Sequence, residues 1–186
     1  ENVKGQAKYA GKVPLILEPG LTFGTGSHAT TRLCLTALER AVHGGERVLD
    51  LGCGSGILSI AALTLGAASA AAVDIDDKCL TVAYENAALN GIGRDRYTVL
   101  VGDAVSDRAL KAQLGGGYDI VVANIVADVI IGLAPSVRQF LKHGGLFLCS
   151  GIIDTRADEV ADALRHAGWT IEDTRSGEGW YSYTCR

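Results

Sequence analysis

The chain has 186 residues, which fits a single domain with its own hydrophobic core. Its hydrophobic fraction of 48% is typical of a globular protein. Its net charge of −4 excludes a basic field that would draw nucleic acid, so no direct nucleic-acid partner is expected. The sequence contains no apolar run of membrane-spanning length, and no membrane partner is expected either.

The pattern from Arg47 onward alternates short apolar runs with segments of helical period. Strands are predicted at 47–51, 69–75, 97–103, 118–125 and 146–151. Helices are predicted at 57–66, 77–91, 105–114, 126–141 and from about 154. Pro135 lies inside the fourth of these helical patterns and should kink it or start a new helix.

The last two predicted strands, 169–176 and 179–186, have no helix between them and should pair as a hairpin around the turn at 177–179. Alternating strands and helices indicate a parallel sheet covered by helices on both faces. The predicted fold class is therefore α/β: a Rossmann-like, doubly wound, mostly parallel seven-stranded sheet with a C-terminal antiparallel hairpin.

The five cysteines are scattered, and no two of them form a C-x-x-C pair. Most lie in apolar runs, which is typical of small buried side chains in a reducing compartment. We therefore expect a cytoplasmic protein whose cysteines are Cys34, Cys53, Cys79, Cys149 and Cys185.

The stretch VLDLGCGSG places Gly52, Gly54 and Gly56 at a turn from a strand into a helix. Glycine allows positive φ and a close approach of the backbone to a ligand. Ligands of open α/β sheets bind outside the carboxyl ends of the strands. Asp74 ends the next predicted strand, where a carboxylate can accept hydrogen bonds from two ribose hydroxyls. The loop is thus predicted to bind a cofactor that contains a nucleoside.

The nicotinamide fingerprint G-x-G-x-x-G would require glycine where this chain has Ile57. Asp50 adds a negative charge beside the loop, which suits a cationic ligand better than a pyrophosphate. S-adenosylmethionine carries a sulfonium and an ammonium and has no phosphate, so this pattern favours it over NAD. The alternative is a tight turn in which Asp50 only caps the following helix.

The segments VLDLGCGSGILSIAALTLGA and VDID resemble the class I S-adenosylmethionine-dependent methyltransferases. A narrower resemblance is carried by LEPGLTFGTGSHATT, VVANIVAD and CSGII, which are similar to the bacterial methyltransferases of large-subunit ribosomal protein eleven. The resemblance covers nearly the whole chain from about Leu15. It implies a protein N-methyltransferase that modifies lysine and amino groups of that ribosomal protein and releases S-adenosylhomocysteine.

That family carries a separate amino-terminal domain for substrate recognition. We therefore expect residues 1–14 to be a linker or tail left from such a region, and residues 15–186 to form the catalytic domain. A chain of this kind should bind the cofactor but methylate the ribosomal protein poorly.

The resemblance implies that GTGSHATT lies over the bound cofactor and that Thr31 contacts it. Gly24 and Gly26 would allow a close, bent backbone, and a helix beginning near His28 or Ala29 would offer its free N–H groups to the methionine carboxylate. The loop should then be more protected from amide exchange when the cofactor is bound. The alternative is a helix capped by Ser27 behind a mobile glycine loop.

Asn124 ends the fourth predicted strand in the motif Asn-Ile-Val-Ala. Its side-chain oxygen and nearby carbonyls can accept hydrogen bonds from the attacking amine and orient the lone pair; the alternative is a strand-end turn. Asp103, after the third strand, is expected to accept the adenine amino group, a role that this position often has in the superfamily. Methyl transfer is a direct displacement, so we predict no acid–base pair.

His28 is interpreted as structural rather than catalytic, and His43, His143 and His166 are interpreted as solvated residues near helix ends. Trp180 either walls the acceptor site or packs as a core aromatic of the hairpin. No grouping of His, Cys and Asp has metal-ligand spacing, so no metal is expected.

Three other functions remain open. They are methylation of another protein lysine or a small amine, an NAD-dependent oxidoreductase, and a non-catalytic module that binds the cofactor.

Overall fold

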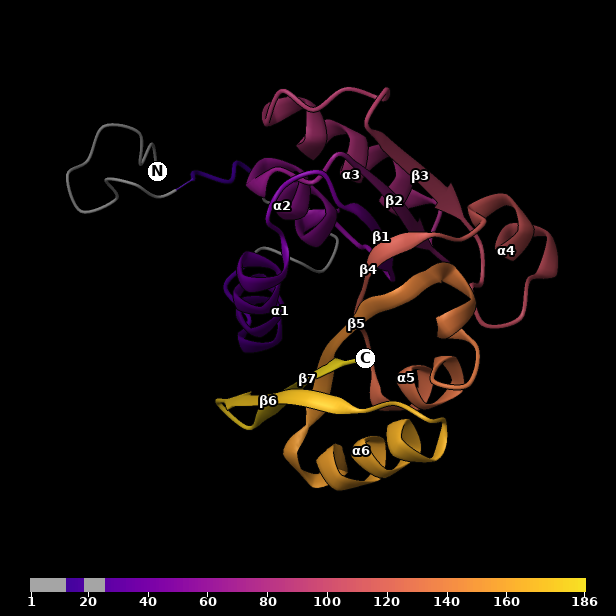
Figure 1. Cartoon of the computed structure of the whole chain (residues 1–186). Coiled ribbons are helices and arrows are strands. Elements are labelled where there is room, and N and C mark those ends of the chain that lie inside the picture. Colours follow the sequence, from indigo (N-terminus) through magenta and orange to yellow (C-terminus); the bar gives the residue numbers. More distant parts are fainter. Residues whose placement is uncertain (1–12, 19–25) are drawn as a thin grey trace.

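The fold is a seven-stranded sheet flanked by helices, described by a computed structural model for residues 13–18 and 26–186 (Figure 1). The strands are β1 Arg47–Leu51, β2 Ser69–Asp74, β3 Tyr97–Val101, β4 Tyr118–Asn124, β5 Leu141–Ile153, β6 Ile171–Gly177 and β7 Trp180–Cys185. The helices are α1 Ala29–Ala41, α2 Ile57–Leu65, α3 Lys78–Leu89, α4 Arg108–Leu114, α5 Ala127–Leu133 and α6 Ala157–His166, with short 3₁₀ helices η2 Val137–Phe140 and η3 Asp154–Arg156.

The strand order is β3-β2-β1-β4-β5-β7-β6. β1 to β5 pair in parallel, and β7 pairs antiparallel with both β5 and β6. The predicted fold class and hairpin are therefore confirmed. The chain winds outward from β1 to β3 and then returns to place β4 on the other side of β1, so the order reverses between β1 and β4. This is the position where doubly wound sheets bind their ligands.

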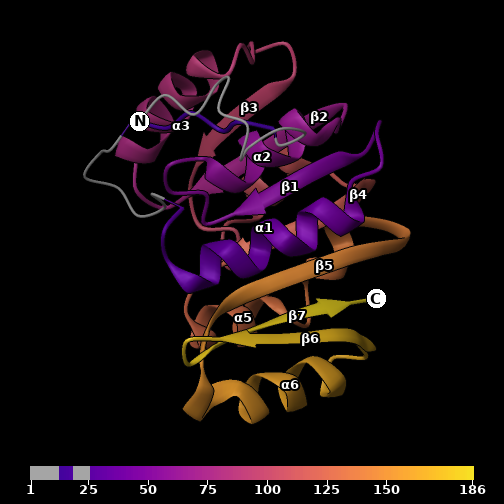
Figure 2. The same ribbon diagram turned by 90° about the vertical axis from the view of Figure 1, so that its left-hand side faces the viewer.

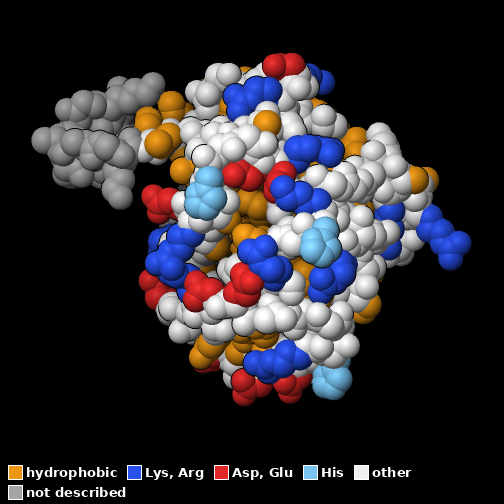
Figure 3. Space-filling model, in the orientation of Figure 1, with side chains coloured by type: hydrophobic (Ala, Val, Ile, Leu, Met, Phe, Trp, Pro, Cys, Tyr) orange, Lys and Arg blue, Asp and Glu red, His pale blue; other side chains and the backbone are white. Residues whose placement is uncertain are grey.

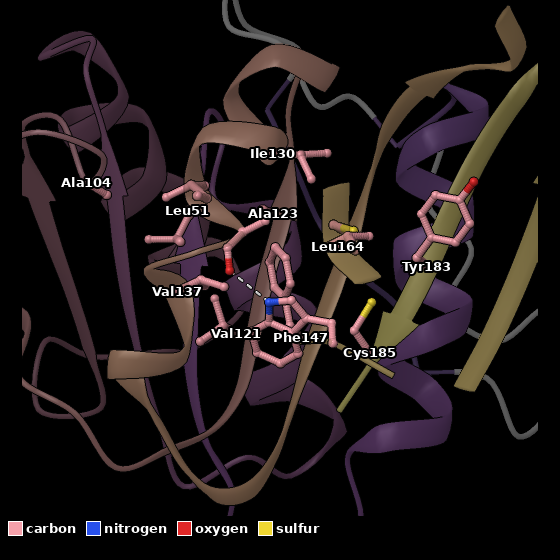
Figure 4. Packing of buried hydrophobic residues seen from close by; sticks show 14 of the residues in the cluster. Leu51, Ala104, Val121, Ala123, Ile130, Val137, Phe147, Leu164, Tyr183 and Cys185 are labelled. Carbon is pink, nitrogen blue, oxygen red and sulfur yellow. Dashed lines mark hydrogen bonds between the residues drawn. The ribbon is translucent and has the colours of Figure 1, made fainter. Parts of the chain in front are cut away.

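Two hydrophobic cores form because successive side chains of a strand point to opposite faces of the sheet. In β4, Ile120 and Val122 pack into the core under α1, α2 and α3, whereas Val121 and Ala123 pack into the core under α4, α5 and α6. Figure 2 shows α1 lying across the sheet, and Figure 4 shows side chains such as Phe147 meeting in the second core.

Element boundaries differ from the expectation mainly in the second half of the chain. β5 begins at Leu141, because Leu141 pairs with Tyr118 before an irregular register leads into the main part of the ladder. His143 consequently lies within β5 rather than near a helix end. Pro135 separates α5 from η2, which confirms the predicted break.

The five cysteines are free and buried, as expected from their apolar surroundings. Figure 3 shows basic and acidic side chains interspersed on the face that it presents, without a large area of one sign. Within residues 13–18 and 26–186, no helix combines the length and the apolar character needed to cross a bilayer.

Candidate functional site

A cavity of about 690 Å³ opens at the carboxyl ends of β1, β2 and β4, on both sides of the point where the strand order reverses. Six of the predicted site residues line it: Thr31, Gly52, Gly54, Asp74, Asp103 and Asn124. Gly26 and Gly56 are not among the lining residues. Gly24 lies outside the described residues. Residues from widely separated parts of the sequence thus meet where the fold predicts a ligand.

The glycine loop bends over the end of β2. Gly52, Gly54 and Gly56 all have positive φ, at 76°, 52° and 79°. The amide of Gly54 donates to Asp74 Oδ2 at 2.9 Å, so the loop and the predicted ribose-binding carboxylate hold each other. The geometry fits a backbone that approaches a ligand closely at Gly52 and Gly54.

Gly56 has a packing role that needs no ligand. A Cβ at this position would lie 2.8 Å from the Tyr97 hydroxyl and 3.0 Å from Ala83 Cβ. Gly26 is similarly close to the cavity wall without lining it, because a Cβ there would lie 3.2 Å from Ile57 Cδ1, and Ile57 is a lining residue. The assignment of both glycines to the cofactor stays a prediction.

Asn86 of α3 supports the glycine loop from behind. Its fully buried side chain donates from Nδ2 to the Ser55 carbonyl at 2.9 Å and accepts from the Glu18 amide at 2.9 Å. It therefore ties the glycine loop to the segment that precedes residues 19–25. Sequence reasoning missed this residue, although a polar side chain among the buried positions of α3 was a usable signal.

The two predicted cofactor carboxylates are both held by local hydrogen bonds. Asp74 Oδ1, the oxygen that Gly54 does not contact, accepts a hydrogen bond from the Asp76 amide at 3.0 Å. Asp103 accepts hydrogen bonds from the Val105 amide at 2.8 Å and from the Ser106 hydroxyl at 2.5 Å. The Ser106 hydroxyl, followed by the Val105 amide, lowers the pKa of Asp103, which favours its ionised form. Because a carboxylate has about four lone-pair sites, both groups retain acceptor capacity toward a ligand.

Asp50 lies beneath the loop and is not a lining residue. It is fully buried, and its Oδ2 accepts from the Ser59 amide at 3.1 Å and the Ser59 hydroxyl at 2.6 Å, in the first turn of α2. This is the helix-capping arrangement that the sequence left open as an alternative. Burial raises the pKa of Asp50 from 3.8 to about 6, so the group is protonated in mild acid and mostly ionised at neutral pH.

Asp50 should make stability depend on pH. Between pH 3.8 and about 6 the folded state binds more protons than the unfolded state, so the free energy of unfolding falls as the pH rises through this window. The shift of about two pKa units corresponds to about 3 kcal/mol. Asp50→Asn cannot titrate, so the stability of the unaltered chain relative to this variant should fall by about that amount between acid and neutral pH.

Urea unfolding of both proteins across this pH range measures the difference. Asp77→Asn is the matched control, because Asp77 is exposed and makes no side-chain capping hydrogen bond. A difference between the unaltered chain and Asp50→Asn that does not change with pH would contradict the raised pKa.

Asn124 and Thr31 meet at the cavity wall although they are 93 residues apart in sequence. The Asn124 amide nitrogen donates to Thr31 Oγ1 at 3.4 Å, and Asn124 Oδ1 is buried without a partner among the described residues. A buried acceptor without a partner is costly unless a ligand or water supplies a donor. Asn124 thus combines a place in the cavity lining with a buried acceptor that lacks a partner, and its role in orienting an amine stays a prediction.

Thr31→Ala should weaken S-adenosylmethionine binding by on the order of 1 kcal/mol, the usual value for one neutral hydrogen bond. Thr31 is fully buried and lines the cavity, so titration calorimetry reports directly on its contact. Thr36→Ala is the matched control, because Thr36 lies on the same helix and donates only to the Arg32 carbonyl. Equal affinities for all three proteins would remove Thr31 from the site.

His28, not Ser27, is the residue that caps α1. Its Nδ1 accepts a hydrogen bond from the Thr30 amide at 3.3 Å. Its ring packs edge-to-face with the Trp180 ring, and the two ring centroids are 5.0 Å apart. Arg32 pairs with Glu178 at the turn between β6 and β7. Trp180 is half-buried rather than part of either core, and it is not among the residues that line the cavity. Its contact with His28 favours the structural interpretation of that histidine.

Several lining residues were missed because their pattern indicated only a helix. Val126, Val129 and Leu133 recur at helical spacing and all three line the cavity; Leu133 is also a core residue, whereas Val126 is 63% exposed. Ile75 follows Asp74 directly and is 77% exposed. An apolar, β-branched residue directly after a strand-end acid was the signal that the sequence offered. Within the described residues, no group of three or more His, Cys, Asp or Glu side chains could hold a metal.

The strand order, the glycine loop and the cavity at the switch point define an α/β methyltransferase fold of the class I type. The family model described as Ribosomal protein L11 methyltransferase (PrmA) matches residues 3–186. The ribosomal protein L11 methyltransferase of Lachnospira eligens is 42% identical over 189 residues, covering 100% of this chain and 57% of the relative. The chain therefore belongs to the ribosomal protein L11 methyltransferase family.

Two further comparisons agree. The Desulforamulus reducens ribosomal protein L11 methyltransferase is 43% identical over 175 residues, covering 94% of this chain and 54% of the relative. The crystal structure of ribosomal protein L11 methylase from Lactobacillus delbrueckii subsp. bulgaricus superposes with a TM-score of 0.82 at 35% identity, covering 92% of this chain and 84% of that one. The chain spans about half the length of the curated relatives that it matches.

Proposed function

We propose that this chain is the catalytic domain of an S-adenosylmethionine-dependent protein N-methyltransferase that modifies lysine and amino groups of ribosomal protein L11. The proposal rests on family membership and on one observation: Asn124, whose buried Oδ1 has no partner among the described residues, lines the same cavity as Asp74 and the glycine loop. The catalytic domain would comprise residues 15–186, preceded by a linker at 1–14.

The residues present fit the cofactor. Positive φ at Gly52 and Gly54 provides a backbone surface without side chains, and Asp74 and Asp103 provide acceptors suited to ribose hydroxyls and an adenine amino group. The first turn of α1 carries backbone N–H groups without helical partners near Thr31, which suit a carboxylate, although His28 already caps that of Thr30. No lysine or arginine lines the cavity within the described residues, which favours a ligand without phosphates. An NAD-dependent oxidoreductase is accordingly disfavoured.

When bound, S-adenosylmethionine supplies an electrophilic methyl group, and the protein has to align the acceptor and exclude water. Asn124 would accept a hydrogen bond from the acceptor amine on its free Oδ1 and so direct the nitrogen lone pair toward the methyl group. The apolar wall formed by Val126, Val129 and Leu133 disfavours an ammonium ion and helps the amine lose its proton. Asn124 itself cannot take up that proton, so it acts by alignment.

The rim of the cavity favours a protein acceptor over a small free amine. Ile75, Val126 and Val129 are large apolar side chains that remain exposed there, and a protein acceptor would cover more of them than a small amine. Asp128 also lines the cavity, where it pairs with Arg156 at 2.8 Å. The activity belongs in the cytoplasm, where five unpaired cysteines suit a reducing environment. It needs neither a membrane nor direct contact with nucleic acid.

The test is to incubate the chain with S-adenosylmethionine labelled on its methyl group and purified ribosomal protein L11, and to locate label by mass spectrometry. We expect label on lysine or terminal amino groups. The same assay is repeated with the chain extended to the length of its relatives. Transfer by the extended chain alone indicates that the shorter chain lacks a recognition region, and no transfer by either indicates that the activity itself is missing. Binding of NAD without binding of S-adenosylmethionine would overturn the proposal, as would cofactor binding without transfer by the extended chain.

A further inference from the structure

Gly151 of β5 faces the backbone of the residue that follows Asn124. A Cβ at Gly151 would lie 2.3 Å from the Ile125 carbonyl oxygen, 2.8 Å from its carbonyl carbon and 2.9 Å from its nitrogen. Backbone atoms cannot rotate away as the end of a side chain can. Gly151 also has a φ of +91°, a backbone angle that residues other than glycine rarely adopt. The pairing of β5 with β7 is irregular at this residue. Only glycine fits here without displacing Ile125.

A second glycine confines Ile125 from the cofactor side. A Cβ at Gly52 would lie 2.4 Å from Ile125 Cγ2, and Gly52 belongs to the glycine loop that lines the cavity. The Ile125 amide also donates to the Ser150 carbonyl at 3.1 Å. Ile125 is thus held between the glycine loop and β5, with its backbone against Gly151 and its side chain against Gly52.

This confinement sets the position of Asn124, because its side chain has little else to hold it. Among the described residues, its amide makes one long hydrogen bond of 3.4 Å to Thr31, and its Oδ1 has no partner. The direction of the side chain therefore depends on the peptide that joins Asn124 to Ile125. A displacement of that peptide by a few tenths of an ångström would turn the acceptor away from an amine.

We propose that Gly151 is a positioning residue for methyl transfer: the absence of its side chain lets the Ile125 backbone lie against β5, and this directs Asn124 Oδ1 toward the acceptor amine. This inference rests on the proposed function. It assigns a role to the motif CSGII, which lies outside the cavity lining and which cofactor binding does not explain.

The test compares Gly151→Ala with Gly168→Ala. The two glycines have similar φ angles, +91° and +85°, so alanine would strain the backbone to a similar degree at either position. A Cβ at Gly168, however, would meet nothing within 4 Å. Both variants should therefore unfold at lower temperature. Only Gly151→Ala should lower the single-turnover methylation rate, by roughly tenfold to a hundredfold, as expected for a small misplacement of an aligning group. Its rate at saturating S-adenosylmethionine should fall by more than its Kd rises, because Gly151 reaches the cavity only through Ile125, which is a lining residue.

NMR gives a readout that does not need activity. The side-chain amide resonances of Asn124 should move in Gly151→Ala and stay in place in Gly168→Ala. An unmoved Asn124 amide in Gly151→Ala, or equal losses of rate in both variants, would overturn the proposal. If Gly151→Ala does not fold, nuclear Overhauser contacts in the unaltered chain decide: contacts between the Gly151 α-protons and the Ile125 amide proton support the close backbone approach on which the proposal rests, and their absence refutes it. A chain extended to the length of its relatives that binds the cofactor but transfers no methyl group counts against the proposed function alone.

Discussion

Replacing Asp74 by alanine is expected to weaken the binding of S-adenosylmethionine by roughly 2–4 kcal/mol, because two hydrogen bonds to a charged acceptor are lost. The carboxylate also accepts the Gly54 and Asp76 amides at 2.9 and 3.0 Å. The substitution therefore removes the predicted ribose contact and releases the glycine loop at the same time. Titration calorimetry with S-adenosylmethionine measures the loss.

Two variants make this result specific. Asp77→Ala changes the net charge by the same amount three residues along the chain, at an exposed position without a side-chain capping hydrogen bond, and should bind normally. Asp74→Asn keeps one acceptor oxygen but not the charge, and should fall between the two. If Asp74→Ala and Asp77→Ala bind equally well, the cofactor does not lie where the fold places it.

The strands and the glycine loop could be predicted because their information is local. Arg47–Leu51 and the three glycines that follow show a strand that turns into a helix within one short stretch, and the structure has β1 and α2 at these positions. The start of β5 could not be predicted in this way. Leu141 looks helical by its spacing from Val137, and it becomes a strand residue only because Tyr118 of β4 lies beside it.

The site shows the same division between local and tertiary information. Gly52, Gly54 and Gly56 look equivalent in the sequence, yet only the first two line the cavity, because Tyr97 and Ala83 happen to lie against Gly56. Asp50 and Asp74 both lie at the carboxyl ends of strands, but only Asp74 lines the cavity. Asp50 instead accepts a hydrogen bond from the Ser59 hydroxyl beneath the loop. The acids and glycines were therefore predictable as a set, whereas the division between packing and ligand contact depended on neighbours distant in sequence.

Gly151 illustrates a third kind of information. Its neighbour Ile125 is determined by the pairing of β4 with β5, which brings Asn124 opposite Ser150. The sequence shows only a glycine near the end of an apolar run, which is compatible with a bulge or a turn. The close approach of two backbones becomes visible only when both strands are in register.

Asn124→Ala should lower the rate of methyl transfer by roughly a hundredfold or more while the affinity for S-adenosylmethionine falls by at most about 1 kcal/mol. The reason is that the free Oδ1 is the buried acceptor at the cavity wall, whereas the cofactor keeps its contacts with Asp74 and Asp103. Single-turnover assays at saturating cofactor, with ribosomal protein L11 as acceptor, separate the rate from the affinity.

Asn124→Asp is the informative companion variant. It keeps an acceptor oxygen for the amine, and the Thr31 hydroxyl can rotate to donate to the new carboxylate. It should therefore retain part of the rate. Both proteins should gain rate with pH as the acceptor amine loses its proton, and Asn124→Asp alone should show a second rise as its carboxyl group ionises. Because Asn124 and Thr31 contact each other, Asn124→Ala combined with Thr31→Ala should lose less than the two single variants together. A rate within about twofold of the unaltered chain for Asn124→Ala would show that the amine is aligned by other groups, since misplacing an aligning group typically costs far more.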